Sequence, residues 1–421
     1  MTRSRTRTWP IWAALAAGVL TGGCRSIGPR ALEQTRLPYN EAVKVTTEQQ
    51  LLLNIVRLRY TDTPSSLSIS SIAAQFEITK GLQIVPFFTA TGGDYNRGSY
   101  AATLPQAQIG GADRPTFSLT PLDDQEFTKK LFTPLSLDGV IYLAKTTWPI
   151  STVFRLYLEN LNWVSNAETA SGPTPKLAPV YADFQHGMEV LQALQDHGHI
   201  AFGLEERTET AAGPLPASVI KAADVIEAAK NGYEYRPDEG GATWTLVKKV
   251  QQPVLRVAPE AVDSPEMRAL ANVFKIKPGL SQYDVTLEAL NPFPSTYPAD
   301  GVTKVDLETR SLLQAMYYLS HGVEIPPEHA AGGLVTVTRD EGGRPFEWQQ
   351  VLKGLFHVQF RKAKDPPADA HVAVEYKGFW FYIDDRDQDT KATFSLLMEL
   401  ARLELTGKGS QPLLTIPLGG R

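Results

Sequence analysis

The sequence contains a single cysteine, Cys24, among its 421 residues. One thiol cannot form a disulfide within the chain, and it cannot supply the cysteine cluster of a structural zinc site. Common catalytic motifs are missing as well, since there is no G-x-S-x-G, no H-E-x-x-H and no glycine-rich phosphate loop. We therefore expect a protein that is not an enzyme and that holds no cofactor.

An excess of basic residues is also missing. The chain has 41 Lys and Arg against 46 Asp and Glu, and no cluster of basic residues stands out. Proteins that bind nucleic acid neutralise phosphates with such clusters. We therefore expect no nucleic-acid partner, whereas 43% apolar residues are enough for sizeable cores in two or three domains.

No uncharged apolar run reaches the roughly 20 residues that a membrane-spanning helix needs. The run Ile11 to Leu20 is shorter, follows three arginines, and ends in the small residues 21–23 before Cys24. A basic start, a short apolar stretch and a small-residue end are typical of an export signal. Residues 1–23 are accordingly predicted to be a signal peptide.

The end of this segment resembles the lipobox of bacterial lipoproteins, in which the cysteine is acylated and the chain is cut just before it. Leu20 lies one position earlier than the leucine of the usual pattern, and Thr21 takes its place. The resemblance implies that Cys24 carries acyl chains, and two or more chains anchor a protein stably in a membrane. Arg25, rather than aspartate, after the cysteine implies the periplasmic side of the outer membrane.

The remaining chain is divided by its pattern of periodicity and of glycine and proline. Residues 24–38 lack an apolar period and are predicted to be a lipidated tether. An N-terminal α+β region is expected over 39–250 and a C-terminal α+β domain over 251–421, with the boundary near 251–253.

The N-terminal region is predicted to open with a helix over 40–60. Apolar residues surround most of its second half, which indicates a buried central helix. A period of two follows from Leu67, slips near Ser70 as at a β-bulge, and continues to Ile78.

Lys80-Gly81 is predicted to turn the chain into a second strand, so that Leu67 to Thr91 forms a hairpin, with Thr116 to Leu119 closing the β region. We expect the rest of the chain to cover this hairpin in a monomer or small oligomer. Pairing of its strands between copies is the alternative, so a homo-oligomer remains possible.

A mainly helical section is predicted next, ending in a hairpin over 233–250. The C-terminal domain is predicted to hold an antiparallel sheet with helices, including strands over 334–338, 356–361, 372–376 and 379–383 and a final helix over 391–405.

Trp380 and Tyr382 share one face of the strand 379–383 and are candidates for ligand binding, because aromatic rings stack on sugars. The strand is apolar on both faces, so a central core strand is the competing interpretation.

Asp385, Asp387 and Asp389 alternate as calcium ligands do at the start of an EF-hand loop, and they are the candidates for a metal site. Thr390 stands where that loop needs glycine, and Leu396 where it needs glutamate. Capping of the final helix by Asp389 or Thr390 explains the run better, so no metal is predicted.

Two stretches, Glu48 to Tyr60 and Gly378 to Asp385, resemble segments of bacterial envelope proteins of unknown function. The sequence as a whole thus indicates a lipoprotein held in the outer membrane through Cys24, acting as a structural or interaction component of an envelope assembly beside other envelope proteins. A glycan- or lipid-binding module is the first alternative, and an unrecognised hydrolase is the second.

Overall fold

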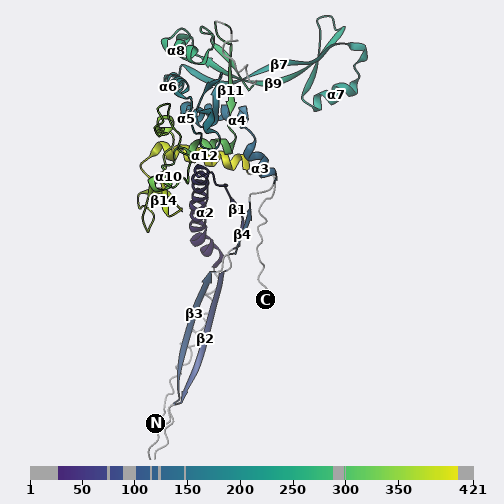
Figure 1. Ribbon diagram of the computed structural model, residues 1–421. Coiled ribbons are helices and arrows are strands. Elements are labelled where there is room, and N and C mark those ends of the chain that lie inside the picture. The colour runs from purple at the N-terminus through teal and green to yellow at the C-terminus, as the bar shows by residue number, and fades with distance from the viewer. Residues whose placement is uncertain are drawn as a thin grey trace, which may run out of the picture. The chain divides into compact units, whose positions relative to one another are not determined.

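The computed structural model of the chain describes residues 27–73, 76–88, 101–113, 116–121, 125–146, 148–287, 298 and 300–405 (Figure 1). The chain divides into two compact units, one formed by residues 1–48, 66–122 and 408–421, the other by residues 49–65 and 123–407. Helices, a mixed sheet and a separate antiparallel sheet occur together, which confirms the α+β class. Within the described ranges, every helix is too short or too polar to traverse a lipid bilayer.

Helix α2 runs from Ile27 to Arg59. Its second half is buried as the sequence predicts, with four residues fully inaccessible to solvent: Leu52, Ile55, Val56 and Leu58. The helix begins at Ile27 and not at Asn40, so most of the predicted tether is helical. Residues 31–34 are strong helix formers, and Pro38 is accommodated inside the helix although its ring removes one backbone donor.

The first unit contains two antiparallel strand pairs. Strand β1 (Leu67–Ala73) pairs with β4 (Thr116–Pro121), and β2 (Phe76–Phe88) pairs with β3 (Ala101–Asp113). The predicted bulge is confirmed, because the β1–β4 register shifts between Ile69 and Ser71.

The predicted turn at Lys80-Gly81 is wrong. Both residues lie inside β2, opposite Ile109 and Gln108 of β3. A two-residue hairpin turn favours Asn or Asp before Gly, which Lys80 does not provide, and the continuous ladder with β3 keeps many more backbone hydrogen bonds. The strands of the hairpin predicted over 67–91 therefore pair with residues 101–121, and residues 89–100 lie outside the described part of the chain.

The second unit is built on a seven-stranded mixed sheet in the order β6-β5-β11-β10-β9-β7, with β8 also paired to β9. Only β10 and β11 run parallel to each other among these pairs. The strands are β5 (Leu158–Leu161), β6 (Val164–Ser165), β7 (Ile200–Pro216), β8 (Tyr233–Pro237), β9 (Thr243–Val257), β10 (Gln282–Thr286) and β11 (Lys304–Thr309).

Strand β9 crosses the predicted domain boundary at 251–253. It pairs with β7 on one side and with β8 and β10 on the other. The residues before and after the boundary thus share one sheet, and the structure does not divide there. The pattern of Gln251-Gln252-Pro253 suggested a linker, but Pro253 sits within the strand opposite Leu204.

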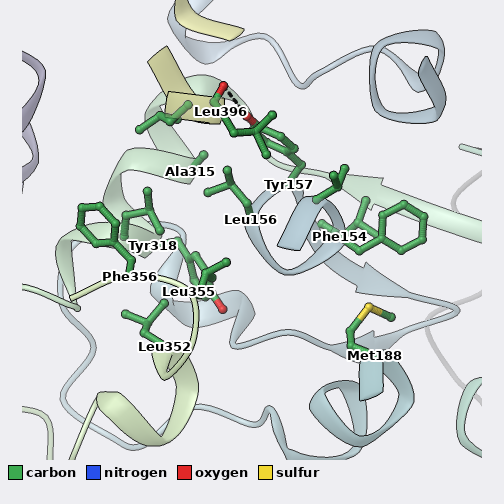
Figure 2. Packing of buried hydrophobic residues seen from close by; sticks show 14 of the residues in the cluster. Phe154, Leu156, Tyr157, Met188, Ala315, Tyr318, Leu352, Leu355, Phe356 and Leu396 are labelled. Atoms are coloured by element: carbon green, nitrogen blue, oxygen red, sulfur yellow. Dashed lines mark hydrogen bonds between the residues drawn. The ribbon is translucent and has the colours of Figure 1, made fainter. Parts of the chain in front are cut away.

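The second unit also contains ten described helices, and all of them except α7 lie at or against its hydrophobic core. They are α3 (Gln125–Phe132), α4 (Leu137–Ala144), α5 (Ile150–Tyr157), α6 (Ala182–Asp196), α7 (Ala222–Lys230), α8 (Pro265–Phe274), α9 (Leu312–Ser320), α10 (Pro327–Ala331), α11 (Gln349–Leu352) and α12 (Gln388–Leu405). Figure 2 shows part of this core, where Tyr157 of α5 donates a hydrogen bond to the Leu396 carbonyl of α12 at 3.3 Å.

A separate antiparallel sheet has the order β12-β14-β13, formed by β12 (Gln359–Arg361), β14 (Phe379–Asp384) and β13 (Ala370–Tyr376). It confirms the predicted C-terminal sheet, with β14 in the centre. The strand predicted over 334–338 is not formed, since none of these residues lies in a strand and the isolated bridges next to them involve Arg339.

Candidate functional site

The predicted lipidation site lies outside the described residues. Cys24 and the predicted signal peptide, residues 1–23, precede the first described residue, Ile27. Lipid attachment at Cys24 therefore stays a prediction from the sequence.

Trp380 and Tyr382 lie on one face of β14, and Phe379, Phe381 and Ile383 on the other face enter the core. Tyr382 is only 4% exposed, and its hydroxyl donates to Gln359 Oε1 at 2.9 Å. The Arg361 guanidinium lies over the same ring, 5.6 Å from its centroid. Tyr382 is thus covered by its own chain and offers no open platform for a sugar.

Trp380 is half-buried on the same sheet face. Its neighbours across the strands are Arg361 of β12 and Glu375 of β13, so charged residues flank the ring on both sides. Of the two aromatic candidates, only Trp380 keeps solvent access.

The three aspartates before α12 have separate local roles. Asp385 accepts a hydrogen bond from Lys391 Nζ at 2.7 Å, and this bond holds the pKa of Asp385 below its usual range. Asp387 accepts from the Thr390 backbone N–H at 3.0 Å and from the Thr390 hydroxyl at 2.7 Å. Asp389 is exposed.

Asp387 is therefore the cap of α12, and the predicted cap at Asp389 or Thr390 is wrong. The helix begins at Gln388, earlier than predicted, which moves the cap position to the residue before it. Across the described part of the chain, no three His, Cys, Asp or Glu side chains gather as metal ligands would.

The stretches Glu48 to Tyr60 and Gly378 to Asp385 contact each other through Tyr60. Tyr60, at the end of the first stretch, makes an edge contact with Phe381 of the second at 6.2 Å between ring centroids. Its hydroxyl lies 2.6 Å from His329 Nδ1, and burial raises the pKa of Tyr60 to about 12. Tyr60 and Phe381 thus belong to one buried aromatic cluster of the second unit.

Sequence reasoning missed a fully buried arginine, Arg310. Its guanidinium donates to the carbonyls of Arg155, Leu156 and Asn166 and stacks on Tyr318 at 3.9 Å. Burial lowers the pKa of Arg310 to about 10. Two of these carbonyls end helix α5, so Arg310 ties a helix end to the sheet and serves a structural purpose. No sequence pattern marks such a residue, because its partners are distant backbone atoms.

An extended segment leaves the mixed sheet of the second unit. Residues 204–252, which we call the arm, comprise most of β7 and β9 with β8 and α7 (Figure 1). Helix α7 has no buried residue, and the apolar side chains of Val219 and Ile226 are 58% and 57% exposed. The arm therefore presents apolar side chains to solvent while adding little to the core.

The base of the arm is held by charged side chains. Arg207 of β7 binds both carboxylate oxygens of Asp284 on β10 at 2.6 Å, reaching across β9, and binds Glu205 at 2.8 Å. These bonds lower the pKa of Asp284. A bidentate arginine pair is geometrically specific, and this one ties the base of the arm to β10.

No family model, no curated protein and no solved structure matches this chain.

Proposed function

We propose that this chain is a lipoprotein anchored in the outer membrane through Cys24, faces the periplasm, and acts as a structural or interaction component of an envelope assembly. The signal and the lipobox-like cysteine support the anchoring. The arm supports the interaction role, and it is the observation on which the proposal rests.

Ordering the arm costs conformational entropy, and contact with a partner would offset that cost. Ordering a residue costs roughly 1–2 kcal/mol of conformational entropy, which is normally offset by burial. In the arm, α7 buries no residue, and Val219 and Ile226 remain exposed close to each other in sequence. Apolar groups presented on a projecting element are typical of protein interaction surfaces.

Trp380 gives the alternative, a glycan-binding module, its only specific support. The ring is partly exposed between Arg361 and Glu375, and polar groups beside an aromatic ring suit a sugar hydroxyl. Retention on purified cell-wall or polysaccharide material that is lost in Trp380→Ala would favour this alternative.

The interaction role is tested with a photo-crosslinking amino acid placed at Ile226 in the full chain, expressed in intact cells. The matched control places it at Lys364, an exposed loop residue of the second unit away from the arm. We expect discrete crosslinked species from position 226 alone. Identical products from both positions, or none from position 226, would contradict an interaction role for the arm.

A further inference from the structure

Strand β7 forms one edge of the mixed sheet. It is 17 residues long, and among the described residues β9 is the only strand that pairs with it. Long unpaired edges are templates for a further strand, and native proteins usually shorten, cover or charge them. The outer side of β7 is thus a strand-binding edge that no described strand occupies.

Two hydrogen bonds establish which β7 residues face outward. The Val257 N–H donates to the Ser281 carbonyl at 2.9 Å, away from β7, whereas the Ala258 N–H donates to His199 at 2.8 Å, toward β7. Backbone direction alternates along a strand, and the register pairs Ile200 with Val257 without a shift as far as Thr210 with Val247. Odd-numbered β7 residues therefore bond β9, and even-numbered ones point their N–H and C=O groups outward.

Pro253 supports this assignment independently. It lies opposite Leu204, at a position whose nitrogen faces away from β7 and needs no donor. The outward-facing residues Leu204, Glu206, Thr208 and Thr210 are all exposed. Their backbone groups are consequently open to an incoming strand.

We propose that this edge binds a second copy of the chain, with two β7 strands pairing antiparallel about a two-fold axis at Thr208. Thr208 then faces itself, and Glu206 faces Thr210 of the other copy, all through outward-facing backbone groups. Arg207, whose guanidinium also binds Asp284 and Glu205 of its own chain, lies opposite Glu209 of the other copy, twice by symmetry. Opposite charges across strands stabilise such a pair.

Charge selects this register over its neighbours. An axis at Arg207 would place arginine against arginine, and an axis at Glu205, Glu206 or Glu209 would place glutamate against glutamate. Parallel pairing in register would place every charged residue of the edge opposite the same residue of the other copy. Like charges directly opposite are destabilising. An axis at Glu206 would pair Glu205 with Arg207 but set Glu206 against itself, so among even-numbered centres the axis at Thr208 combines attractive pairs with no like pair.

The ladder is short, because the β7–β9 register shifts after Thr210. A short ladder contributes more to the choice of partner than to the affinity. Confinement of both copies to one membrane would raise their effective concentration and so favour pairing. The proposal rests on the arm being an interaction surface and names a second copy as its partner at the base of the arm. The arm tip stays available for other proteins.

The test is disulfide trapping of the full chain purified in detergent. Thr208→Cys places two thiols across the axis, where Cα atoms of a hydrogen-bonded pair are about 5.5 Å apart, within disulfide range. Glu206→Cys is the matched control, because its two introduced thiols would be offset by about 13 Å along the strands. The wild type, whose single cysteine is Cys24, serves as the background control, because any disulfide dimer that it forms must involve Cys24.

We expect roughly tenfold more disulfide dimer from the Thr208→Cys chain than from the Glu206→Cys chain, as geometry within disulfide range requires. Equal yields would mean random collision, no dimer would mean no pairing, and a disulfide to another protein would mean a different occupant. Each of these results overturns the proposal. Failure here with position 226 still crosslinking in cells would leave the interaction function intact.

A second variant separates pairing from folding. Thr208→Pro removes an outward N–H and no bond to β9, so the fold should persist. Sedimentation of the variant should show the monomer at protein concentrations where the wild type shows a dimer. Equal dimerisation of the two chains would also overturn the proposal.

Discussion

At the residue scale, the capping bond of Asp387 is the clearest single contribution to the stability of α12. The side chain accepts both from the Thr390 N–H and from the Thr390 hydroxyl, which is itself buried and accepts from the His357 N–H at 2.9 Å. We expect Asp387→Ala to lower the free energy of unfolding by about 0.5–2 kcal/mol, the usual cost of a lost cap. Denaturant unfolding measures this change.

Asp389→Ala is the matched control for the cap. Asp389 lies two residues after the cap, is exposed and makes no capping bond. Its replacement should therefore change the free energy of unfolding by less than about 0.5 kcal/mol. A larger loss in Asp389→Ala than in Asp387→Ala would show that the cap is misassigned. Added calcium should leave the unfolding midpoints of both variants unchanged. Lys391 already binds the carboxylate of Asp385, and Thr390 already binds that of Asp387.

His357 gives the molecule a pH-dependent contact. The bond from its Nε2 to Glu324 at 2.8 Å raises the pKa of His357 above the usual value of about 6.5. Because the pKa of His357 is raised in the folded state, the contact with Glu324 makes its full contribution to the free energy of unfolding below about pH 6.5. That contribution is lost as pH rises through the pKa that His357 has in the folded protein. The stability difference between the wild type and His357→Gln should therefore be larger at about pH 5.5 than at about pH 9.

Glu324→Gln provides the control for this pH dependence. Without the carboxylate, the difference made by His357→Gln should become nearly independent of pH. Denaturant midpoints of the four chains across this range form a double-mutant cycle. A coupling that grows as pH rises would contradict the assignment.

At the element scale, the contact between α6 and α8 depends on a glycine. A Cβ added at Gly187 would overlap the ring of Phe274 and come within 3.1 Å of Val273. Alanine normally stabilises a helix by up to about 1 kcal/mol relative to glycine. Here the overlap should dominate, and we expect Gly187→Ala to destabilise the fold by about 1–3 kcal/mol.

Gly172→Ala is the matched control, since nothing lies within 4 Å of its added Cβ. It should be neutral or slightly stabilising, because alanine restricts the unfolded chain more than glycine does. Thermal unfolding of the two variants separates close packing from glycine flexibility. Equal behaviour would mean that α6 and α8 can move apart at no cost.

Elements were predictable where one local pattern decides them. The bulge near Ser70, the buried half of α2 and the strands β13 and β14 all follow from periodicity over a few residues. The partner of β2 is different, because Lys80-Gly81 looks like a turn locally while the competing ladder is supplied by β3. Long-range pairing is invisible to a local pattern.

At the scale of the whole molecule, the same limit explains the predicted domain boundary. Gln251-Gln252-Pro253 has the composition of a linker, yet Pro253 fits inside β9 because its nitrogen faces the side that needs no donor from it. Arg310 was also beyond prediction, since its partners are carbonyls more than a hundred positions away in sequence. The fold class survives such errors because it depends on the mixture of elements and not on their order.

The anchoring proposed for the whole molecule would depend on a single sulfur, that of Cys24. Two or more acyl chains, at about 0.8 kcal/mol for each buried methylene, hold a protein stably in a membrane. We expect wild-type protein in the outer-membrane fraction and Cys24→Ala protein outside the membrane fractions. Cell fractionation with immunodetection measures this distribution.

The control for this prediction is the mature mass of each chain. The wild type should begin at an acylated Cys24, because cleavage just before that residue is what the resemblance to a lipobox predicts. The variant should carry no acyl mass, so that its release can be attributed to the missing lipid and not to misfolding, provided that both chains unfold at the same temperature. An unmodified wild-type chain that begins at Met1, or an unchanged membrane fraction in Cys24→Ala, would show that the protein is held in some other way.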